Sequence, residues 1–371
     1  MPMRSNPSAR KSYDMAPVSR FQSIRWWLIL ILSLELVIRL FIYENPPTEY
    51  HPGWGFVPQA NTQAVHGLEG FGVSDYLSNG EIATPYQDGV SIVVLGDSTT
   101  RAIQISSSEN FVSLTESGLR QRRIRADLHN LGKADRSVAD YVYLAPFVIR
   151  EYQPEIVILQ VNPASFQLAL RDNRENYFVT TATGDLRLVH TEVSPSFNLE
   201  FANVISHSGL LSLFEYRLRT SLTRAAHARA GESGTAEEVI AEDELSNDAA
   251  SQMTLREYGE WLYPQIQAIK TAYPDSRIVF LIIPYTPSFS ESRDGEVTWI
   301  SGVDNSLARV LEAMDGSSVV YTLEAFKALY KTRHLLPRGT FNSPFNFGHL
   351  NPAGQQAVAG DLISFLEGVL K

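Results

Sequence analysis

From residue 91 to the C-terminus, short apolar runs alternate with segments of helical periodicity. The apolar runs lie at 91–95, 127–131, 155–161, 278–283 and 318–322. The third run includes Ile156-Val157-Ile158-Leu159, a continuous apolar stretch of the kind that is buried on both faces of a parallel sheet. This alternation predicts an α/β fold with a doubly wound, mostly parallel five-stranded sheet, right-handed crossovers and helices on both faces.

The helices between these runs are predicted from side-chain spacing and from capping residues. They are expected near 108–123, 138–152, 253–272, 303–314 and 352–370. Ser106 and Glu109 have the spacing of a capping box for the first of them. Asn351 suits the N-cap of the last helix, and Pro352 suits its first turn.

The length of 371 residues allows one large core with additions. We expect a basic cytoplasmic tail at 1–25, a membrane segment at 26–43, a membrane-proximal cap at 44–90, an α/β domain at 91–371 and an insertion within it at 171–252. Residues 224–252 are rich in Ala, Glu, Ser and Asp and contain no large apolar cluster, which predicts a mobile surface segment. Residues 177–222 hold enough Phe, Leu and Tyr to pack, for example as a lid.

The N-terminal segment 26–43 reads WWLILILSLELVIRLFIY, and eighteen helical residues span about 27 Å, close to the thickness of the hydrocarbon core. Glu35 and Arg39 interrupt it, but their i, i+4 spacing lets them pair. Basic residues precede the segment, and none follows Arg39 before Arg101. The positive-inside rule then predicts a single-pass signal anchor with a cytoplasmic N-terminus and a periplasmic domain. A buried or interfacial helix is the alternative interpretation.

Charge and composition exclude several classes of function. A net charge of −10 argues against nucleic acid as the main partner. The absence of cysteine excludes disulfides, thiolate zinc sites and a cysteine nucleophile. The histidines other than His349 show no metal-ligand spacing, so neither a metal nor a cofactor is expected.

Polar residues follow the predicted strands at the points where the strands end. Gly96-Asp97-Ser98 follows the first strand, Gly132 the second and Asn162 the third, and His349 lies in the loop before the last helix. In open α/β sheets, sites form beyond the carboxyl ends of the strands. We therefore expect these residues to converge on one edge of the sheet.

This set of residues is suited to acyl transfer through a covalent intermediate. Ser98 would attack a carbonyl carbon, and His349 would accept the hydroxyl proton and pass it to the leaving group. The backbone N–H groups of Ser98 and Gly132 and the side-chain amide of Asn162 are candidate oxyanion donors. Asp97 is expected to tie the turn together by hydrogen bonds. Each residue also has a plain structural interpretation. Ser98 can be a helix N-cap and Gly132 the end of a strand, while Asn162 can form an Asx turn and His349 can be an ordinary loop histidine.

The chain resembles the SGNH hydrolase superfamily, the GDSL-type esterases, in four separated blocks. The matching residues are Gly96-Asp97-Ser98, Asn130-Leu131-Gly132 with Ser137, Asn162, and His349-Leu350-Asn351 with Gly354. The resemblance covers roughly 91–170 and 277–371, and with the N-terminal anchor it is closest to bacterial envelope members. It implies a flavodoxin-like fold and an ester hydrolase or O-acyltransferase activity.

The sequence departs from the family pattern in three places. Thr99-Thr100 follows the first block, the third block reads Gln160-Val161-Asn162-Pro163, and Asn346 stands where the family has an aspartate three residues before the histidine. An amide at 346 cannot stabilise an imidazolium as a carboxylate does. Three possibilities follow: a backbone carbonyl or an acid elsewhere in the chain orients His349, the enzyme works as a slow Ser–His dyad, or the domain has lost chemistry and kept binding.

The sequence thus predicts an extracytoplasmic serine-dependent enzyme that acts on acyl esters, with those of envelope glycans as the expected substrates. Hydrolysis and transfer to a polysaccharide share Ser98 and His349 and differ only in whether water or a sugar hydroxyl reaches the acyl-enzyme. A transfer reaction would also allow a partner protein to donate the acyl group. The alternative is a non-catalytic envelope binding module on the same fold.

Overall fold

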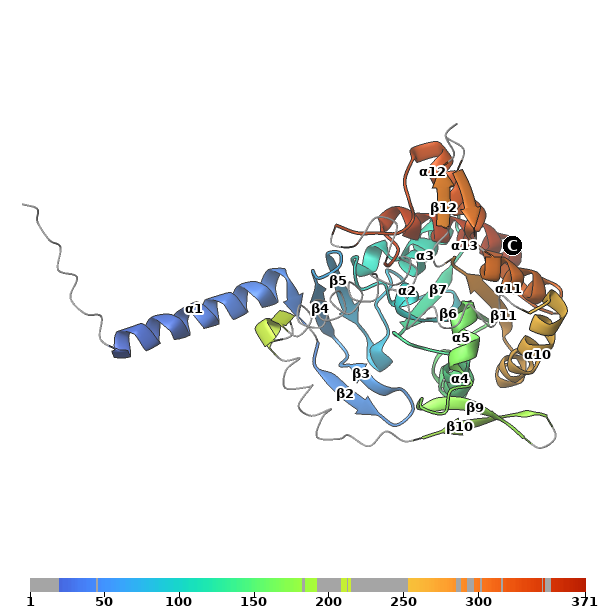
Figure 1. The fold of residues 1–371 in the computed structure, drawn as a ribbon, viewed down its shortest axis with the longest axis horizontal. Helices are drawn as coiled ribbons and strands as arrows, with labels where there is room; N and C mark the ends of the chain where they lie inside the picture. Colours follow the sequence, from blue (N-terminus) through green and yellow to red (C-terminus); the bar gives the residue numbers. More distant parts are fainter. Residues whose placement is uncertain are drawn as a thin grey trace, which may run out of the picture.

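The computed structural model describes residues 20–44, 46–181, 184–191, 208–211, 213–214, 253–284, 288–291, 297–300, 302–314, 316–341, 343 and 348–371. Within these ranges an N-terminal helix leads into a group of short strands and then into a central sheet flanked by helices (Figure 1). The segment predicted to be mobile, 224–252, lies outside the described residues.

The central sheet has five parallel strands, as predicted. They are β6 (Val90–Gly96), β7 (Ala126–Gly132), β8 (Ile156–Val161), β11 (Arg277–Ile282) and β14 (Ser318–Tyr321). Their order in space is β14-β11-β8-β6-β7, with all neighbouring pairs parallel. The winding direction therefore reverses between β6 and β8, and a crevice for ligands opens beyond the carboxyl ends of strands at such a point.

Helices cover both faces of the sheet because successive strand residues point to opposite sides. Ile92 and Val94 of β6 face a core shared with α3 (Phe111–Gln121) and α13 (Pro352–Leu370). Val93 and Leu95 face a second core. The helices of that second core are α4 (Val138–Tyr152), α5 (Pro163–Leu168), α10 (Leu255–Ala272) and α11 (Gly302–Glu312). Every residue of β8 is buried, which explains its continuous apolar run Ile156–Leu159; Gln160 is the one polar residue of the strand.

Capping residues decide where the flanking helices begin. Asn351 caps α13 as predicted, because its Oδ1 accepts the N–H of Gly354 at 3.0 Å. The capping box predicted at Ser106 is wrong. Ser106 precedes the short 3₁₀ turn η2 (Ser107–Glu109) without a side-chain bond, and Asn110, in an extended conformation, caps α3 through Ser113 N–H at 2.9 Å. Helices α2 (Ser98–Arg101) and α12 (Leu323–Arg333) were not predicted.

Short antiparallel strands make up the region before the sheet, which we call the cap. They are β1 (Tyr43–Glu44), β2 (Thr48–His51), β3 (Gly55–Pro58), β4 (Thr62–His66) and β5 (Gly72–Tyr76), followed by the 3₁₀ turn η1 (Ser78–Gly80). Ile82 donates its N–H to Asn130 O in β7 at 2.9 Å. This bridge covers part of the sheet's edge strand and joins the cap to the domain.

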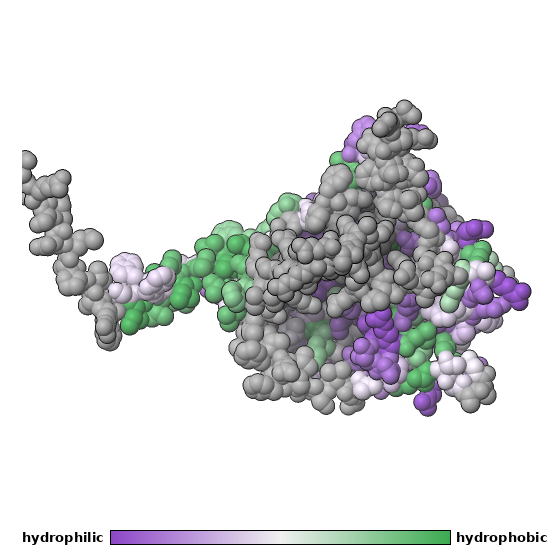
Figure 2. All heavy atoms as spheres, viewed as in Figure 1, coloured by the Kyte–Doolittle hydropathy of each residue, from purple (hydrophilic) through white to green (hydrophobic). Residues whose placement is uncertain are grey.

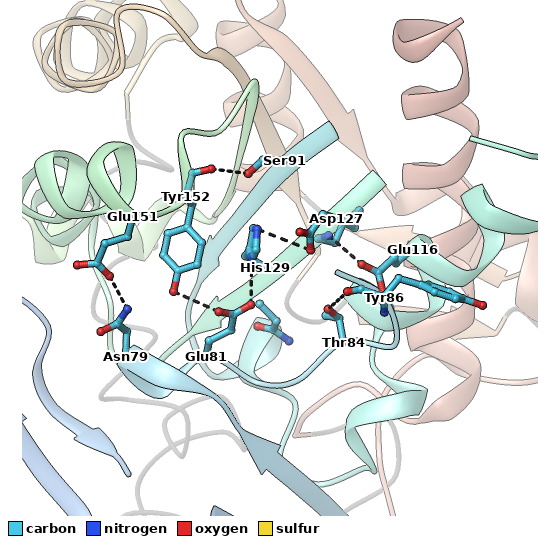
Figure 3. A network of polar contacts seen from close by, with 12 residues as sticks. Asn79, Glu81, Thr84, Tyr86, Ser91, Glu116, Asp127, His129, Glu151 and Tyr152 are labelled. Atoms are coloured by element: carbon cyan, nitrogen blue, oxygen red, sulfur yellow. Dashed lines mark hydrogen bonds and ion pairs between the residues drawn. The ribbon is translucent and has the colours of Figure 1, made fainter. Parts of the chain in front are cut away.

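A polar network fastens the cap to β7 and α4 (Figure 3). Glu81 Oε1 lies 2.9 Å from His129 Nδ1, and Tyr152 donates its hydroxyl to Glu81 Oε2 at 3.2 Å. Burial lowers the pKa of His129, but the hydrogen bond and charge of Glu81, together with Asp127 and Glu116, raise it above its ordinary value. The cap is therefore held by charged groups as well as by backbone pairing.

Two further hairpins, β9 (Asn176–Thr180) with β10 (Leu186–His190) and β12 (Ser288–Glu291) with β13 (Val297–Ile300), lie outside the central sheet. The first belongs to the predicted insertion and rests on α4. Asn176 donates to Asp140 Oδ1 at 2.8 Å, and the rings of His190 and Tyr143 stack with centroids 4.3 Å apart.

Helix α1 (Arg20–Phe41) extends away from the body of the molecule and exposes large apolar side chains along its length (Figures 1 and 2). Glu35 and Arg39 pair at 2.7 Å, as their spacing predicted. Across the described ranges, no helix combines the length and apolar character needed to cross a bilayer. The crossing predicted at 26–43 therefore gains no support from the structure.

Candidate active site

Ser98 occupies the first position of α2, directly after the turn that ends β6. Asp97 is the N-cap of this helix, and its Oδ1 accepts the N–H of Thr99 at 2.7 Å. A Cβ at Gly96 would lie 1.9 Å from Thr100 Oγ1, so only glycine permits the tight turn from strand to helix. The turn places Ser98, which is half-buried, at the crevice beside the carboxyl ends of β6 and β8.

Asp97 ties this turn to the neighbouring strand β8, in keeping with its predicted structural role. Its N–H donates to Gln160 Oε1 at 2.9 Å, and its Oδ2 accepts from Gln160 Nε2 at 3.3 Å and from Asn162 Nδ2 at 3.2 Å. Gln160 is one of the residues by which the third block departs from the family pattern. Here it fixes the serine turn, a role that sequence analysis did not recognise.

Asn162 lies at the end of β8 and caps α5. Its Oδ1 accepts from Ser165 N at 2.9 Å and from Ser165 Oγ at 3.1 Å. These bonds, together with the one from Nδ2 to Asp97, fix the orientation of the amide beside the serine turn. Its role as an oxyanion donor stays a prediction.

Gly132 lies at the end of β7, where contacts within the protein engage its backbone. Its N–H donates to Asn130 Oδ1 at 3.0 Å, and a Cβ at this position would lie 2.3 Å from Arg101 N. Glycine is therefore needed here because α2 packs directly on the end of β7. Its function as an oxyanion donor stays a prediction, with the N–H already engaged in this structure.

The turn after Gly132 offers backbone donors that sequence analysis overlooked. The N–H groups of Ala134 and Asp135 make no hydrogen bond to any residue that the structure describes. Asp135 adopts a φ of 61°, an uncommon conformation for a residue other than glycine. Nothing in the local sequence signals this turn, because its shape depends on the packing of β7 against α2.

His349 is held by a carboxylate from the cap. Its Nδ1 lies 2.5 Å from Glu69 Oε2, and its backbone N–H donates to Glu69 Oε1 at 2.9 Å. Burial raises the pKa of Glu69, but the hydrogen bonds and charge of His349, with the charge of Arg338, bring it below its ordinary value. The carboxylate is thus ionised at neutral pH. We infer that Nδ1 carries the proton that faces it, which leaves Nε2 to act as a base.

Close packing places the Glu69 loop near the serine turn. A Cβ at Gly70 would lie 2.2 Å from Gln104 O, and Gln104 Nε2 donates to Leu350 O at 3.0 Å. The loop that carries Glu69, the segment after α2 and the residue after His349 therefore meet in one layer. Thr340 secures the loop further by donating its hydroxyl to Glu69 O at 2.6 Å.

The structure thus provides an acid elsewhere in the chain for His349, the first of the three possibilities left open by the sequence. Asn346, the residue at the family's aspartate position, lies outside the described residues. Ser98 Oγ and His349 Nε2 are not hydrogen-bonded to each other, and such bonds often tighten only when substrate is bound. Across the described ranges, no group of three His, Asp or Glu side chains could hold a metal ion.

Glu69 could not have been found from the sequence. It is separated from His349 by 280 residues, so no spacing rule connects the two. Its one local signal is the run Gly67-Leu68-Glu69-Gly70, whose glycines allow close approach of backbones. That run superficially resembles a dinucleotide loop, but Gly67 packs against the backbone of Ile42, and Gly70 packs against Gln104 in the segment after α2.

No protein-family model matches the chain, and no curated protein is similar to it. Among solved structures, TesA is 12% identical with a TM-score of 0.38, covering 75% of this chain and 99% of that one. The esterase EstA from Pseudoalteromonas sp. is 10% identical with a TM-score of 0.35, covering 76% and 99% of the two chains. An acetylxylan esterase from Geobacillus stearothermophilus is 13% identical with a TM-score of 0.37, covering 75% and 95%. At these values the function has to be argued from the site itself.

Proposed function

We propose that this chain is a serine-dependent ester hydrolase in which Ser98 is the nucleophile, His349 the general base and Glu69 the residue that orients it. The observation that carries the proposal is the two-pronged contact between Glu69 and His349. A carboxylate on Nδ1 fixes the tautomer and stabilises the imidazolium that forms during reaction. The contact lies in the layer that also packs against the segment after α2.

The reaction proceeds in two halves. Ser98 Oγ attacks the ester carbonyl carbon, and its proton passes to His349 Nε2. The imidazolium then gives this proton to the departing alkoxide, which leaves an acyl group on Ser98. In the second half His349 takes a proton from water, the hydroxide attacks the acyl carbon, and Ser98 recovers its proton as the acid is released.

Negative charge on the carbonyl oxygen needs donors that are already in place. The N–H of Ser98, the N–H of Gly132 and the amide of Asn162 are the donors predicted from the sequence. The unengaged N–H groups of Ala134 and Asp135 add two candidates at the end of the adjacent strand. The same acyl-enzyme would support transfer if a sugar hydroxyl replaced water.

We further propose that the domain works outside the cytoplasm on acyl esters of envelope glycans. The basic residues before α1 and the exposed apolar side chains along it support attachment to a membrane surface. Transfer of the acyl group, with a partner protein as its donor, is the variant of this proposal that a polysaccharide acceptor would require.

The test is hydrolysis of p-nitrophenyl acetate and labelling with a fluorophosphonate, measured on the full-length protein in detergent. We expect Ser98→Ala to abolish labelling and to lower kcat/KM by at least ~10³-fold. Ser364→Ala is the matched control, because Ser364 is exposed on α13 and bonds only to Gly360 O at 2.9 Å. Equal rates for the wild type and Ser98→Ala would exclude the serine mechanism and favour a binding module.

A further inference from the structure

A pocket of about 350 Å³ opens beside the loop that follows β7. Its walls come from the cap at 53–55, the loop at 133–136, the start of α4 and the segment 173–176. The volume is at the lower end of the range for small-molecule sites, roughly 300–1,000 Å³.

The pocket is lined by three cationic side chains, and some of their donors lack partners among the described residues, although Arg174 Nη2 donates to Asp135 O. Lys133 Nζ makes no hydrogen bond to any residue in the described ranges, and Arg174 Nε is buried without an acceptor. Arg136 is 7% exposed and donates to Leu131 O, but no carboxylate oxygen of a described residue lies within 4.0 Å of it. Such buried cations are costly unless an anion pairs with them.

The acids around the pocket supply that anion only in part. Asp140 already accepts from Ser137 N–H at 2.7 Å, from Ser137 Oγ at 2.8 Å and from Asn176 at 2.8 Å, and it lies 3.9 Å from Arg174. Asp135 is exposed and Glu175 is partly exposed. The carboxylates therefore lie at the rim or are engaged elsewhere, and the cationic donors remain available to a ligand.

The charge of Lys133 depends on this environment. Burial and the charge of Arg136 lower the pKa of Lys133 to about 8, and the charges of Glu175 and Asp140 oppose that shift. Lys133 is thus mostly protonated at neutral pH. An anion in the pocket would favour the protonated form further, while a neutral ligand would not.

The pocket borders the serine turn. Lys133 donates its backbone N–H to Gly96 O at 3.0 Å, two residues before Ser98. The backbone of the loop that forms one wall of the pocket is therefore fixed to the turn that carries the nucleophile. A ligand that extends from the pocket would reach the carboxyl edge of the sheet.

We propose that this pocket binds the carboxylate of an acidic saccharide, the sugar whose acyl ester Ser98 cleaves. The inference rests on the proposed function and names its substrate class. Lys133, Arg136 and Arg174 receive the carboxylate, while Asn173 and Asn176 lie among the polar groups that can meet sugar hydroxyls.

Binding is tested first, apart from catalysis. Calorimetry of Ser98→Ala with a de-esterified oligogalacturonide should show an affinity that falls steeply with added salt, and a neutral xylooligosaccharide should bind at least about tenfold more weakly. Adding Lys133→Gln should weaken binding of the oligogalacturonide about tenfold, since a charge-assisted contact is lost. Lys327→Gln is the control, because Lys327 pairs with Glu324 on α12, away from this pocket.

Turnover is the second arm. Lys133→Gln should lower kcat/KM for acetylated oligogalacturonide about tenfold and leave p-nitrophenyl acetate within about twofold. In the wild type, KM for the acidic substrate should rise as pH passes about 8, where Lys133 loses its proton. Equal binding of acidic and neutral saccharides, or no effect of Lys133→Gln, would overturn the inference. Absence of any esterase activity while the oligogalacturonide still binds would instead overturn the proposed hydrolase.

Discussion

Two glutamates of the cap each hold a histidine, and the two pairs differ in what surrounds them. Glu69 contacts His349 at 2.5 Å and Glu81 contacts His129 at 2.9 Å, in both cases through Nδ1. The second ring is enclosed: its Nε2 lies 3.7 Å from Asp127, and Tyr152 packs against it with ring centroids 4.5 Å apart. The side chain of His349 is 31% exposed and that of His129 is 16% exposed.

The comparison shows that a carboxylate–histidine contact does not by itself indicate catalysis. Both nitrogens of His129 face acids of the protein, since Nδ1 contacts Glu81 and Nε2 lies 3.7 Å from Asp127 (Figure 3). His349 spends only Nδ1, together with its backbone N–H, on Glu69. The first pair joins the cap to the sheet, and the second leaves Nε2 of His349 without a contact to any acid of the described residues.

Replacing each histidine by alanine should give the largest difference in kcat/KM between the two pairs. We expect His349→Ala to lower kcat/KM for p-nitrophenyl acetate by about 10³-fold or more, because no other base replaces Nε2. His129→Ala should keep kcat/KM within about threefold, since it removes a contact of the cap and no catalytic group. Comparable losses in both variants would remove the distinction between the pairs.

Replacing each glutamate should also lower kcat in one pair and not in the other, with a smaller effect than replacing the histidine. Glu69→Gln should lower kcat by about 10²–10⁴-fold, as an amide can neither fix the tautomer nor stabilise imidazolium. Glu81→Gln, at the matched position of the other pair, should leave kcat nearly unchanged. Full activity of Glu69→Gln, measured at several pH values, would show that His349 works without this acid.

The effects on the free energy of unfolding should have the opposite order, with the larger loss at the Glu81–His129 pair. Glu81→Gln should lower the free energy of unfolding by about 1–3 kcal/mol, because it weakens a hydrogen bond to a mostly buried ring and leaves a donor poorly paired. Glu69→Gln should cost less, since its contact is more exposed to solvent. Urea unfolding followed by circular dichroism measures both; a larger loss for Glu69→Gln would contradict the assignment of Glu81 as the structural carboxylate.

The smallest expected difference between the two pairs is in how the free energy of unfolding depends on pH. The folded pKa of His129 is raised above 6.5, so its pair contributes stability that is present below 6.5 and is lost as pH rises through the folded pKa. Glu69 has a lowered pKa, so its contribution is present above 4.5 and is lost as pH falls. Subtracting the profile of His129→Gln from that of the wild type removes the titration common to both; Glu116, whose pKa burial raises to about 7 against the opposing charge of His129, titrates in both proteins. A flat difference between pH 6 and 9 would show that the Glu81–His129 ion pair adds nothing.

The sequence predicted the parts of the fold that depend on local periodicity. The apolar runs became β6, β7, β8, β11 and β14, and the central strands β6, β8 and β11 are the most continuously apolar because both of their faces are buried. The Asn351 cap followed from one side chain and its neighbours in sequence. Polar residues at strand ends could be placed at one edge because parallel strands end together.

What could not be predicted depends on contacts between distant segments. Glu69 acquires its role only when the cap packs on the sheet. The close approach of Arg101 to Gly132 likewise exists only because α2 packs on the end of β7. Loop geometry of this kind is set by tertiary packing, which sequence periodicity does not record.

The contact between Glu69 and His349 also has a consequence for the order in which the protein is made. Its partners are 280 residues apart, so the acid is synthesised well before the histidine. A nascent chain can complete β6 and its serine turn before His349 has been added. The contact that orients the imidazole can therefore form only after residue 349 has been added and reaches the folded cap, and shorter chains lack it.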